Sequence, residues 1–374
     1  MTTKEIGELR RRFKSDRTNM TAVCGCYVSG SGEILATFRQ SVGLMSEEDK
    51  EKYLGTLKKV LSGTQDKNLL DLSFRTAQVA DSEEHRLLMH LRDSALEDEE
   101  AVRKLYDTII HALNMEDHYL ILLGQERYDV PFKAKDGAEL EDSSEVFSYV
   151  VCAVCPVKPG KETLSYVAEE KEFHNRSALW AAGAPELGFL FPAFDGRRTN
   201  IYNCLYYTRS AKNNHPEVVD ALFKLTPPPP AEEQKATFGG LLRGALAEEC
   251  RLDVVQSVQQ ELCERIEAHK ELKSDEALVV SREEVRGVLE NAGVSEEKLA
   301  KFAVSFDESF GDDALLSPRN LVERRTKLVT PDVVITVAPD KADLVETRVI
   351  GGVKYILIRA EDGVEVNGVD IEIE

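Results

Sequence analysis

Apolar and polar positions in the first third of the chain follow strand and helix periods in turn. Two β-prone runs are joined by Ser29-Gly30-Ser31-Gly32, which predicts a hairpin with a four-residue loop. Later segments repeat apolar residues every three or four positions, which is typical of amphipathic helices. The expected strands are 21–28, 33–40, 68–74 and 118–124, and the expected helices are 3–14, 46–61, 82–95 and 98–114. This alternation predicts layers of sheet and helix.

The middle of the chain is denser in aromatic residues. Residues 145–207 hold 11 of the 26 aromatic side chains. The run VFSYVVCAVCPV (146–157) is expected to be a central strand ended by Pro156. The polar residues 125–144 are expected to form a loop or a projecting hairpin, residues 161–182 carry a loose helical spacing, and a final strand is expected near 199–208.

Four consecutive prolines, Pro227–Pro230, indicate a stiff linker and a domain boundary. Helical spacing dominates after them, and Ser281 with Glu284 matches a capping box. The expected helices are 232–249, 253–271, 281–292 and 295–309. The last residues return to β-prone runs, at 332–337, 344–350 and 353–359, with Gly351-Gly352 as a two-residue hairpin turn.

The fold class expected from these patterns is α+β, with mixed α/β structure in its first part. An N-terminal sheet-and-helix domain would precede an acidic helical segment and a C-terminal β-hairpin tail. The expected bounds are 1–225 for the mixed domain, 226–231 for the linker, 232–325 for the helices and 326–374 for the tail.

Charge narrows the range of partners. The 374 residues carry 47 basic and 67 acidic side chains, a formal net charge of −20. Such a surface repels phosphate backbones and anionic lipid, so extended nucleic-acid binding and membrane binding are not expected. Residues 231–325 hold 13 basic and 21 acidic side chains, and this acidic helical segment is the surface that we expect protein partners to use. A charged amino terminus without an apolar segment predicts a cytoplasmic protein.

One basic segment departs from this balance. RRRFKSDR (10–17) has five positive charges and one negative charge. Cations near a helix C-terminus are ordinary complements of the helix dipole. A contact to RNA or to the ribosome is the alternative.

Seven cysteines without a secretory signal predict reduced thiols. Cys152 and Cys155, with Cys24 and Cys26, have the residue types of a zinc site. However, positions three apart in a strand point to opposite faces, and buried cysteine is common. The sequence therefore favours structural thiols and no cofactor, and zinc stays an alternative.

Residues 172–208 hold the candidate chemistry. His174 and Asp195 have the types of a general acid and base, and Arg176 or Arg197 would suit an anionic substrate. Further candidates for contact with a substrate are Trp180, Asn200 and Tyr202. The alternative is an exposed charged segment followed by an ordinary turn. Without a nucleophile elbow, a dinucleotide fingerprint or a phosphate loop, we expect a non-catalytic binding or regulatory protein, with an enzyme acting in this pocket as the alternative.

Several longer stretches resemble one known family across nearly the full chain. They are EIGELRRRFK (5–14), GCYV (25–28), QVADSEEHRLLMHLRDS (78–94), EFHNR (172–176), PELGFLFPAFDGRRTNIYNCLYYT (185–208), DVVQSV (253–258) and VETRVIGGVKYILIRAEDGVEVNGVDI (345–371). The family is one of uncharacterised Firmicutes proteins, described only as a domain of unknown function. The resemblance implies a cytosolic bacterial protein of anaerobic type, and it implies no activity, substrate or catalytic residue.

Overall fold

The computed structural model describes residues 1–133, 139–160, 163–176, 179–272, 277–312, 314–323, 325–360 and 363–372. Internal contacts divide the chain into two compact units, Met1–Pro230 and Ala231–Glu374. None of the helices in the described ranges combines the length and the apolarity needed to cross a bilayer.

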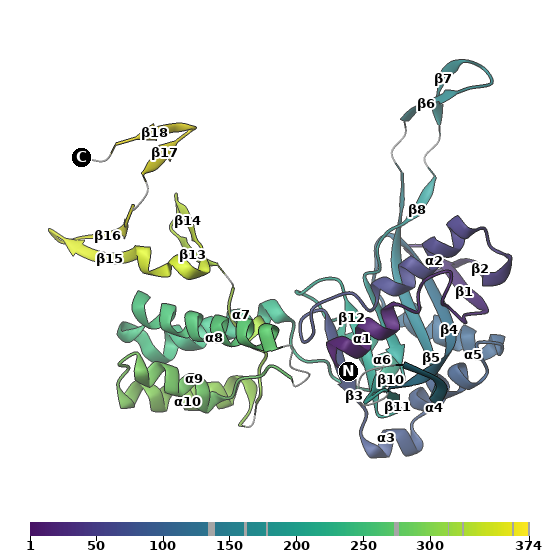
Figure 1. Cartoon of the computed structure of the whole chain (residues 1–374), viewed down its shortest axis with the longest axis horizontal. Helices are drawn as coiled ribbons and strands as arrows, with labels where there is room; N and C mark the ends of the chain where they lie inside the picture. Colours follow the sequence, from purple (N-terminus) through teal and green to yellow (C-terminus); the bar gives the residue numbers. More distant parts are fainter. Residues whose placement is uncertain are drawn as a thin grey trace. The chain divides into compact units, whose positions relative to one another are not determined.

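A single antiparallel sheet organises the first unit (Figure 1). Seven of its strands lie in one continuous order, and the eighth, β8 (Trp180–Ala182), pairs with β5. The order is β2 (Ile34–Ser41), β1 (Ala22–Val28), β4 (His118–Lys133), β5 (Glu139–Pro159), β9 (Leu187–Phe191), β12 (Asn203–Thr208) and β3 (Leu69–Ser73). The two ends of this order are therefore β2 and β3.

Helices cover both faces of the sheet, because its inner strands are apolar on both sides. On one face, the short α3 (Thr76–Asp81) leads into α4 (Glu83–Asp93), which packs with α5 (Glu99–Ala112) and α6 (Pro216–Phe223) through residues such as Leu91 and Leu105. On the other face, α1 (Thr3–Arg10) and α2 (Glu47–Lys59) bury Leu9 and Leu57. A short 3-10 helix, η1 (Val42–Leu44), follows β2.

Side-chain caps explain where several of these helices begin. Ser46, Ser82 and Asp98 each accept hydrogen bonds from the first-turn amides of the helix that follows. The first helix is capped by Thr2 through a capping box. The Thr2 side chain accepts from the amide of Glu5, whose carboxylate accepts from the amide of Thr2 in return.

The long central strands bear on two predictions, and they correct the second. The polar stretch 125–144, expected to form a loop or a projecting hairpin, belongs to the antiparallel hairpin of β4 and β5, which pair as far as Lys133 with Glu139, while residues 134–138 lie outside the described part. Pro156 does not end β5. Pro156 pairs with Tyr119 of β4, and its carbonyl accepts a hydrogen bond from the amide of Gly183, just beyond the end of β8. Proline has no N–H to donate, and it is tolerated here because the pairing on this side of β5 is interrupted between β9 and β8.

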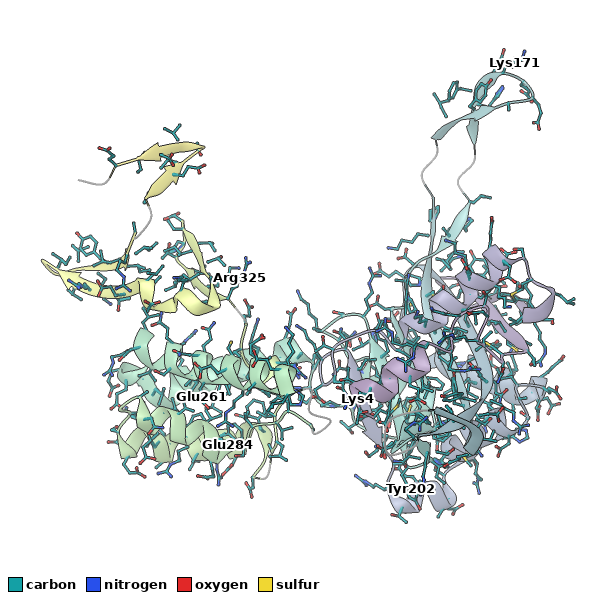
Figure 2. The ribbon with its side chains drawn as sticks, viewed as in Figure 1. Lys4, Lys171, Tyr202, Glu261, Glu284 and Arg325 are labelled. Carbon is teal, nitrogen blue, oxygen red and sulfur yellow. The ribbon has the colours of Figure 1, made fainter. Side chains whose placement is uncertain are left out.

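The helix expected at 161–182 is wrong. This segment forms β6 (Thr163–Val167) and β7 (Glu172–Arg176), an antiparallel hairpin that extends beyond β8, with Lys171 in its turn (Figures 1 and 2). Leu164, Tyr166 and Phe173 are 72%, 55% and 66% exposed. A helix needs a core against which to bury its apolar stripe, and these three described side chains are not buried in one. Two further short strands, β10 (Ala193–Asp195) and β11 (Arg198–Asn200), form a separate hairpin.

The second unit begins with the four predicted helices. They are α7 (Ala231–Leu246), α8 (Leu252–Leu272), α9 (Arg282–Asn291) and α10 (Glu296–Phe310). The predicted capping box of Ser281 and Glu284 is present. Phe302, Phe306 and Leu289 lie in the centre of the shared core. Short 3-10 helices follow α7 and α10, η2 (Ala247–Glu249) and η3 (Pro318–Asn320).

The described residues of the tail form three two-stranded hairpins. They are β13 (Thr326–Val329) with β14 (Val334–Val337), β15 (Val345–Ile350) with β16 (Val353–Ile358), and β17 (Val364–Val366) with β18 (Val369–Ile371). The 3-10 helix η4 (Pro339–Leu344) separates the first two. The predicted α+β fold class, with its β-hairpin tail, is confirmed.

Candidate functional site

The two predicted acid–base residues lie on different hairpins. His174 is on β7, where its Nε2 lies 2.8 Å from Oε2 of Glu170. Asp195 ends β10, and its Oδ2 accepts a hydrogen bond from Asn200 Nδ2 at 3.1 Å. Tyr202 is 44% exposed. Among the described residues, no contact joins His174 to Asp195, so the structure does not bring these two groups together.

Arg176 and Trp180 lie near His174 in the chain. Arg176 ends β7, and its side chain is outside the described part. Trp180 is 54% exposed and stacks on His118, with ring centroids 4.6 Å apart. The Nδ1 atom of His118 is 2.9 Å from the hydroxyl of Tyr27. Trp180 therefore belongs to a surface aromatic stack at the base of the β6–β7 hairpin.

Arg197 lies in the turn between β10 and β11 and forms an ion pair with Glu8 of α1. Its Nη2 is 2.9 Å from Oε1 of Glu8, and its Nε is 3.2 Å from Oε2. Tyr128 donates a hydrogen bond to the same carboxylate at 2.7 Å. Because the Glu8 side chain is only 8% exposed, this guanidinium ties the β10–β11 turn to the first helix.

Arg12, from the predicted basic segment, is held in the same way. Its Nε and Nη2 lie 3.0 and 2.9 Å from Oε1 of Glu126, which is fully buried. Tyr149 donates to the other carboxylate oxygen at 2.9 Å. Burial raises the pKa of Glu126, and hydrogen bonds from the Asn19 amide and Arg12 oppose that rise. Arg12 thus compensates a buried charge.

The four cysteines considered as metal ligands divide between the two faces of the sheet. Cys24, Cys26 and Cys152 lie in the core under α4 and α5, whereas Cys155 lies in the core under α1 and α2. Burial raises the pKa of Cys26 to about 11 and that of Cys155 to about 12. The part of the chain that the structure describes contains no group of three or more His, Cys, Asp or Glu residues that could hold a metal.

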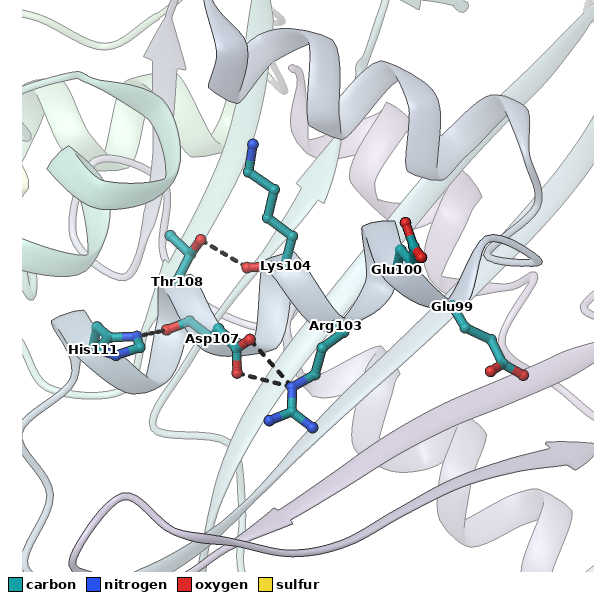
Figure 3. A pocket seen from close by; sticks show the side chains of 7 residues that line it. All are labelled: Glu99, Glu100, Arg103, Lys104, Asp107, Thr108 and His111. Atoms are coloured by element: carbon teal, nitrogen blue, oxygen red, sulfur yellow. Dashed lines mark hydrogen bonds and ion pairs between the residues drawn. The ribbon is translucent and has the colours of Figure 1, made fainter.

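Helix α5 lines three depressions, and two of them are larger than the third. Figure 3 shows the first, a hollow of about 500 Å³ on the outer face, where Arg103 Nε is 3.0 and 3.2 Å from the two oxygens of Asp107. Its lining comes from that one helix: Glu99, Glu100, Arg103, Lys104, Asp107, Thr108 and His111. Groups from a single helix surface do not converge on a ligand from several sides.

The second depression, which we call the β2 groove, is built from three parts of the fold. It has a volume of about 420 Å³ and lies between α5, the loop before α5, and strands β1 and β2. Its lining residues are Cys24, Gly25, Thr37, Phe38, Arg39, Leu96, Glu99, Val102, Arg103 and Tyr106. Apolar walls with a few converging polar groups, in a volume of roughly 300–1,000 Å³, are typical of binding sites.

Tyr106 and Arg39 are the polar groups that distinguish the β2 groove. Tyr106 is 3% exposed, and its hydroxyl is a buried atom without a hydrogen-bond partner among the described residues. Arg39 Nη1 donates to the carbonyl of Leu96 and lies 3.5 Å from Sγ of Cys24. In the described ranges, Arg39 has no carboxylate partner, so its charge is available to a ligand.

Cys24 contributes a neutral thiol to this site. Burial raises the pKa of Cys24, and the nearby guanidinium of Arg39 offsets only part of that rise. A thiol with a raised pKa carries little thiolate at neutral pH and is therefore a poor nucleophile. The groove is better suited to binding than to nucleophilic chemistry.

The strand beside the groove has one open edge. The amide of Val42 donates to the carbonyl of Thr21 at 2.9 Å, and the register pairs Ala22 with Ser41. Hydrogen-bonded and non-bonded pairs alternate along an antiparallel ladder. Thr37, Arg39 and Ser41 therefore direct their backbone N–H and C=O groups away from β1, toward the open edge.

Sequence reasoning missed this site because its parts are distant in the chain. Thr37 and Arg39 belong to a strand that was predicted, and Tyr106 to a predicted helix, but no local spacing connects them. Sheet pairing and the packing of α5 bring them together.

Comparisons with known proteins give one match. A family described as "Domain of unknown function (DUF4317)" matches residues 1–369. The comparison with curated proteins finds no match, and neither does the comparison with solved structures.

Proposed function

The chain belongs to the DUF4317 family, and we propose that it is a non-catalytic binding protein that takes up an extended segment of a partner protein beside β2. The observation that carries this proposal is an open strand edge lying next to the β2 groove. In strand addition, main-chain hydrogen bonds supply affinity and side-chain pockets supply specificity.

The main-chain part of the site is the free edge of β2. This strand is eight residues long, and six of its eight residues are exposed. Monomeric proteins usually protect such an edge with lysine, proline, a covering segment or a very short strand. Neither lysine nor proline occurs in β2, so the edge is accessible to another strand.

The side-chain part of the site follows from the register. Thr37 and Arg39 face the open edge with their backbone groups, while their side chains line the β2 groove. A residue of the incoming strand directly opposite Arg39 would place its side chain on the same face of the sheet. An acidic side chain there would meet the guanidinium of Arg39, and a neighbouring one would reach the hydroxyl of Tyr106.

Charge in the groove supports a partner segment that combines apolar and acidic residues. The guanidinium groups of Arg39 and Arg103 line it together with the single carboxylate of Glu99, and because Arg103 already pairs with Asp107, Arg39 is the cation offered to a partner. Leu96 and Val102 supply apolar walls. Arginine is the side chain best suited to hold a carboxylate through paired hydrogen bonds.

The other predictions about function stay predictions. Use of the acidic helical segment by protein partners stays one, although ion pairs such as Arg265 with Glu284 and Arg282 with Asp307 engage part of its charge. RNA contact by residues 10–17 would have to proceed without Arg12, which Glu126 engages. An enzyme at residues 172–208 would need His174 and Asp195 to approach each other.

The proposal is tested with a phage-displayed library of random linear peptides, selected on the immobilised full chain. We expect enriched peptides that alternate apolar residues with an Asp or Glu. Synthetic copies should lose affinity when alternate backbone amides are methylated, because the methyl group removes the donors of strand addition.

The matched variants are Thr37→Pro and Thr37→Val. Proline removes the amide that faces the open edge and leaves the ladder to β1 intact, whereas valine keeps that amide. Peptide binding should be lost in Thr37→Pro and retained in Thr37→Val, with both variants folded by circular dichroism. Selection of no peptide, or equal binding by both variants, would overturn the proposal.

A further inference from the structure

We propose that a second copy of this chain pairs with β15, so that two β15–β16 hairpins form one four-stranded antiparallel sheet around a twofold axis at Thr347. The proposal concerns the tail of the second unit and is independent of the groove beside β2. It rests on the isolation of the hairpin, the direction of its backbone groups and the self-complementary order of its side chains.

Several apolar side chains of the β15–β16 hairpin are exposed. Val349, Ile350, Val353 and Ile358 are 68%, 54%, 55% and 56% exposed. Within the described residues, β15 and β16 pair only with each other (Figure 1). An isolated two-stranded hairpin is marginally stable in water, and further strands are the usual remedy.

The backbone of β15 offers hydrogen bonds on its open side. The amide of Arg359 donates to the carbonyl of Leu344 at 2.8 Å, which makes these two a hydrogen-bonded pair. With the observed register, Glu346, Arg348 and Ile350 then bond to β16 in alternation. Val345, Thr347 and Val349 must therefore direct their backbone groups to the open edge.

The turn agrees with this assignment. Gly351 and Gly352 both have positive φ, +59° and +82°, as a two-residue type I′ turn requires. Such a turn is closed by a hydrogen-bonded pair, here Ile350 and Val353. Counting back from either end of the hairpin thus gives the same set of edge-facing residues.

When two copies of β15 pair in antiparallel fashion, the charged side chains of one copy lie opposite the opposite charges of the other. In an antiparallel pair centred on Thr347, Val345 faces Val349 of the second copy, and Glu346 faces Arg348. Both charged pairs occupy non-hydrogen-bonded positions, where opposite side chains come closest. Two opposite-charge pairs form at once and favour association. The valine pairs contribute less, because Val345 is already 4% exposed within its own chain.

A second copy fits this edge, because an antiparallel copy of β15 places a Glu opposite an Arg at both charged positions. The outer strand β16 lacks this property. Its edge-facing residues are Lys354, Ile356 and Ile358. In an antiparallel pair of two β16 strands centred on Ile356, lysine would lie opposite isoleucine. Within one chain, Glu346 and Arg348 already approach each other at 3.0 Å, so the test must separate pairing between chains from pairing within a chain.

Mixing two single variants of the full chain separates them. Glu346→Arg places arginine opposite arginine at both positions of a dimer, and Arg348→Glu places glutamate opposite glutamate. Each variant alone should dimerise roughly tenfold to a hundredfold more weakly than the natural chain. An equimolar mixture should regain the natural affinity, because each Arg then faces a Glu of the other copy.

The measurement is sedimentation velocity over a concentration series, with circular dichroism to verify that each variant is folded. Lys354→Glu is the matched control, since it changes a charge on the same hairpin at the other edge, and it should dimerise like the natural chain. A natural chain that is monomeric throughout the series would overturn the proposal. So would single variants that dimerise normally, or a mixture that stays as weak as its components.

Discussion

The two open strand edges, β2 in the first unit and β15 in the second, are alike in backbone and different in side chains. Each offers three edge-facing residues: Thr37, Arg39 and Ser41 on β2, and Val345, Thr347 and Val349 on β15. β2 carries one guanidinium and no carboxylate, so an antiparallel second copy of β2 would offer that charge no partner. β15 carries one of each at reciprocal positions. The backbone makes both edges receptive, and the side chains select the partner.

The two edges also differ in what lies behind them. β2 ends an eight-stranded sheet with a helix-covered core on each face. β15 belongs to a hairpin of two strands with exposed valine and isoleucine. A preformed edge binds a ligand at little cost in ordering, whereas a marginal hairpin gains stability from the association itself.

The largest effect is expected from removing the ion pair between Arg12 and the buried Glu126 of β4. Arg12→Ala leaves the buried carboxylate of Glu126 unpaired, and the free energy of unfolding of the first unit should fall by about 3 kcal/mol. Urea unfolding followed by the fluorescence of Trp180 measures this. Arg11→Ala is the control and should change the value by less than about 0.5 kcal/mol. Dimerisation through β15 should be unaffected, and a loss of dimer would show that the two edges are not independent.

The next effect comes from proline substitutions, one at each of the two strand edges. Thr347→Pro removes one edge amide from each copy at the centre of the proposed sheet, and dimer affinity should fall roughly a hundredfold. Thr37→Pro should leave dimerisation unchanged and abolish peptide binding. Thr347→Val keeps the amide and should preserve the dimer. The comparison fails if either proline affects both processes, as measured by sedimentation and by peptide titration.

A smaller effect is expected from the charge in the β2 groove. Arg39→Gln should weaken a selected acidic peptide about tenfold, since a hydrogen bond to a charged group is lost. Lys104→Gln lies on the outer face of α5, away from the groove, and serves as the control. Isothermal titration gives both affinities. Equal affinities for the two variants would remove Arg39 from the site and leave the backbone edge as its only determinant.

The smallest effect concerns thiol reactivity and its pH dependence. The raised pKa values of Cys24 and Cys26, about 11 for the latter, reduce their thiolate fraction at neutral pH. Alkylation of Cys24 should therefore be slower than that of the half-buried Cys250 and should accelerate as pH rises toward the raised pKa. A bound peptide should slow Cys24 further and leave Cys250 unchanged. Mass spectrometry of labelled peptides gives these rates, and fast labelling of Cys24 at pH 7 would contradict a buried thiol with a raised pKa.

Local signals in the sequence predicted most elements of the fold. Gly351-Gly352 between β-branched runs predicted the β15–β16 hairpin, and Ser281 with Glu284 predicted where α9 begins. In both cases the determining interaction lies within a few residues of the chain. The segment at 161–182 is predicted incorrectly because its described apolar side chains, such as Leu164 and Phe173, are exposed, and burial is not a local property.

The candidate site depended on contacts that sequence spacing does not encode. His174 and Asp195 are close in the chain but lie on separate hairpins. Arg39 and Tyr106 are distant in the chain but line one groove. Whether β2 is an edge strand depends on the order of the whole sheet, which pairs strands far apart in sequence.

Hydrogen–deuterium exchange at two protein concentrations tests the contrast between the edges most directly. The edge-facing amides of Val345, Thr347 and Val349 should gain protection as concentration rises, because a second copy occupies them. Those of Thr37, Arg39 and Ser41 should exchange at the same rate at both concentrations and gain protection only when a selected peptide is added. Unchanged exchange on β15, or concentration-dependent protection on β2, would contradict the assignment of one edge to the chain's own copy and the other to a different partner.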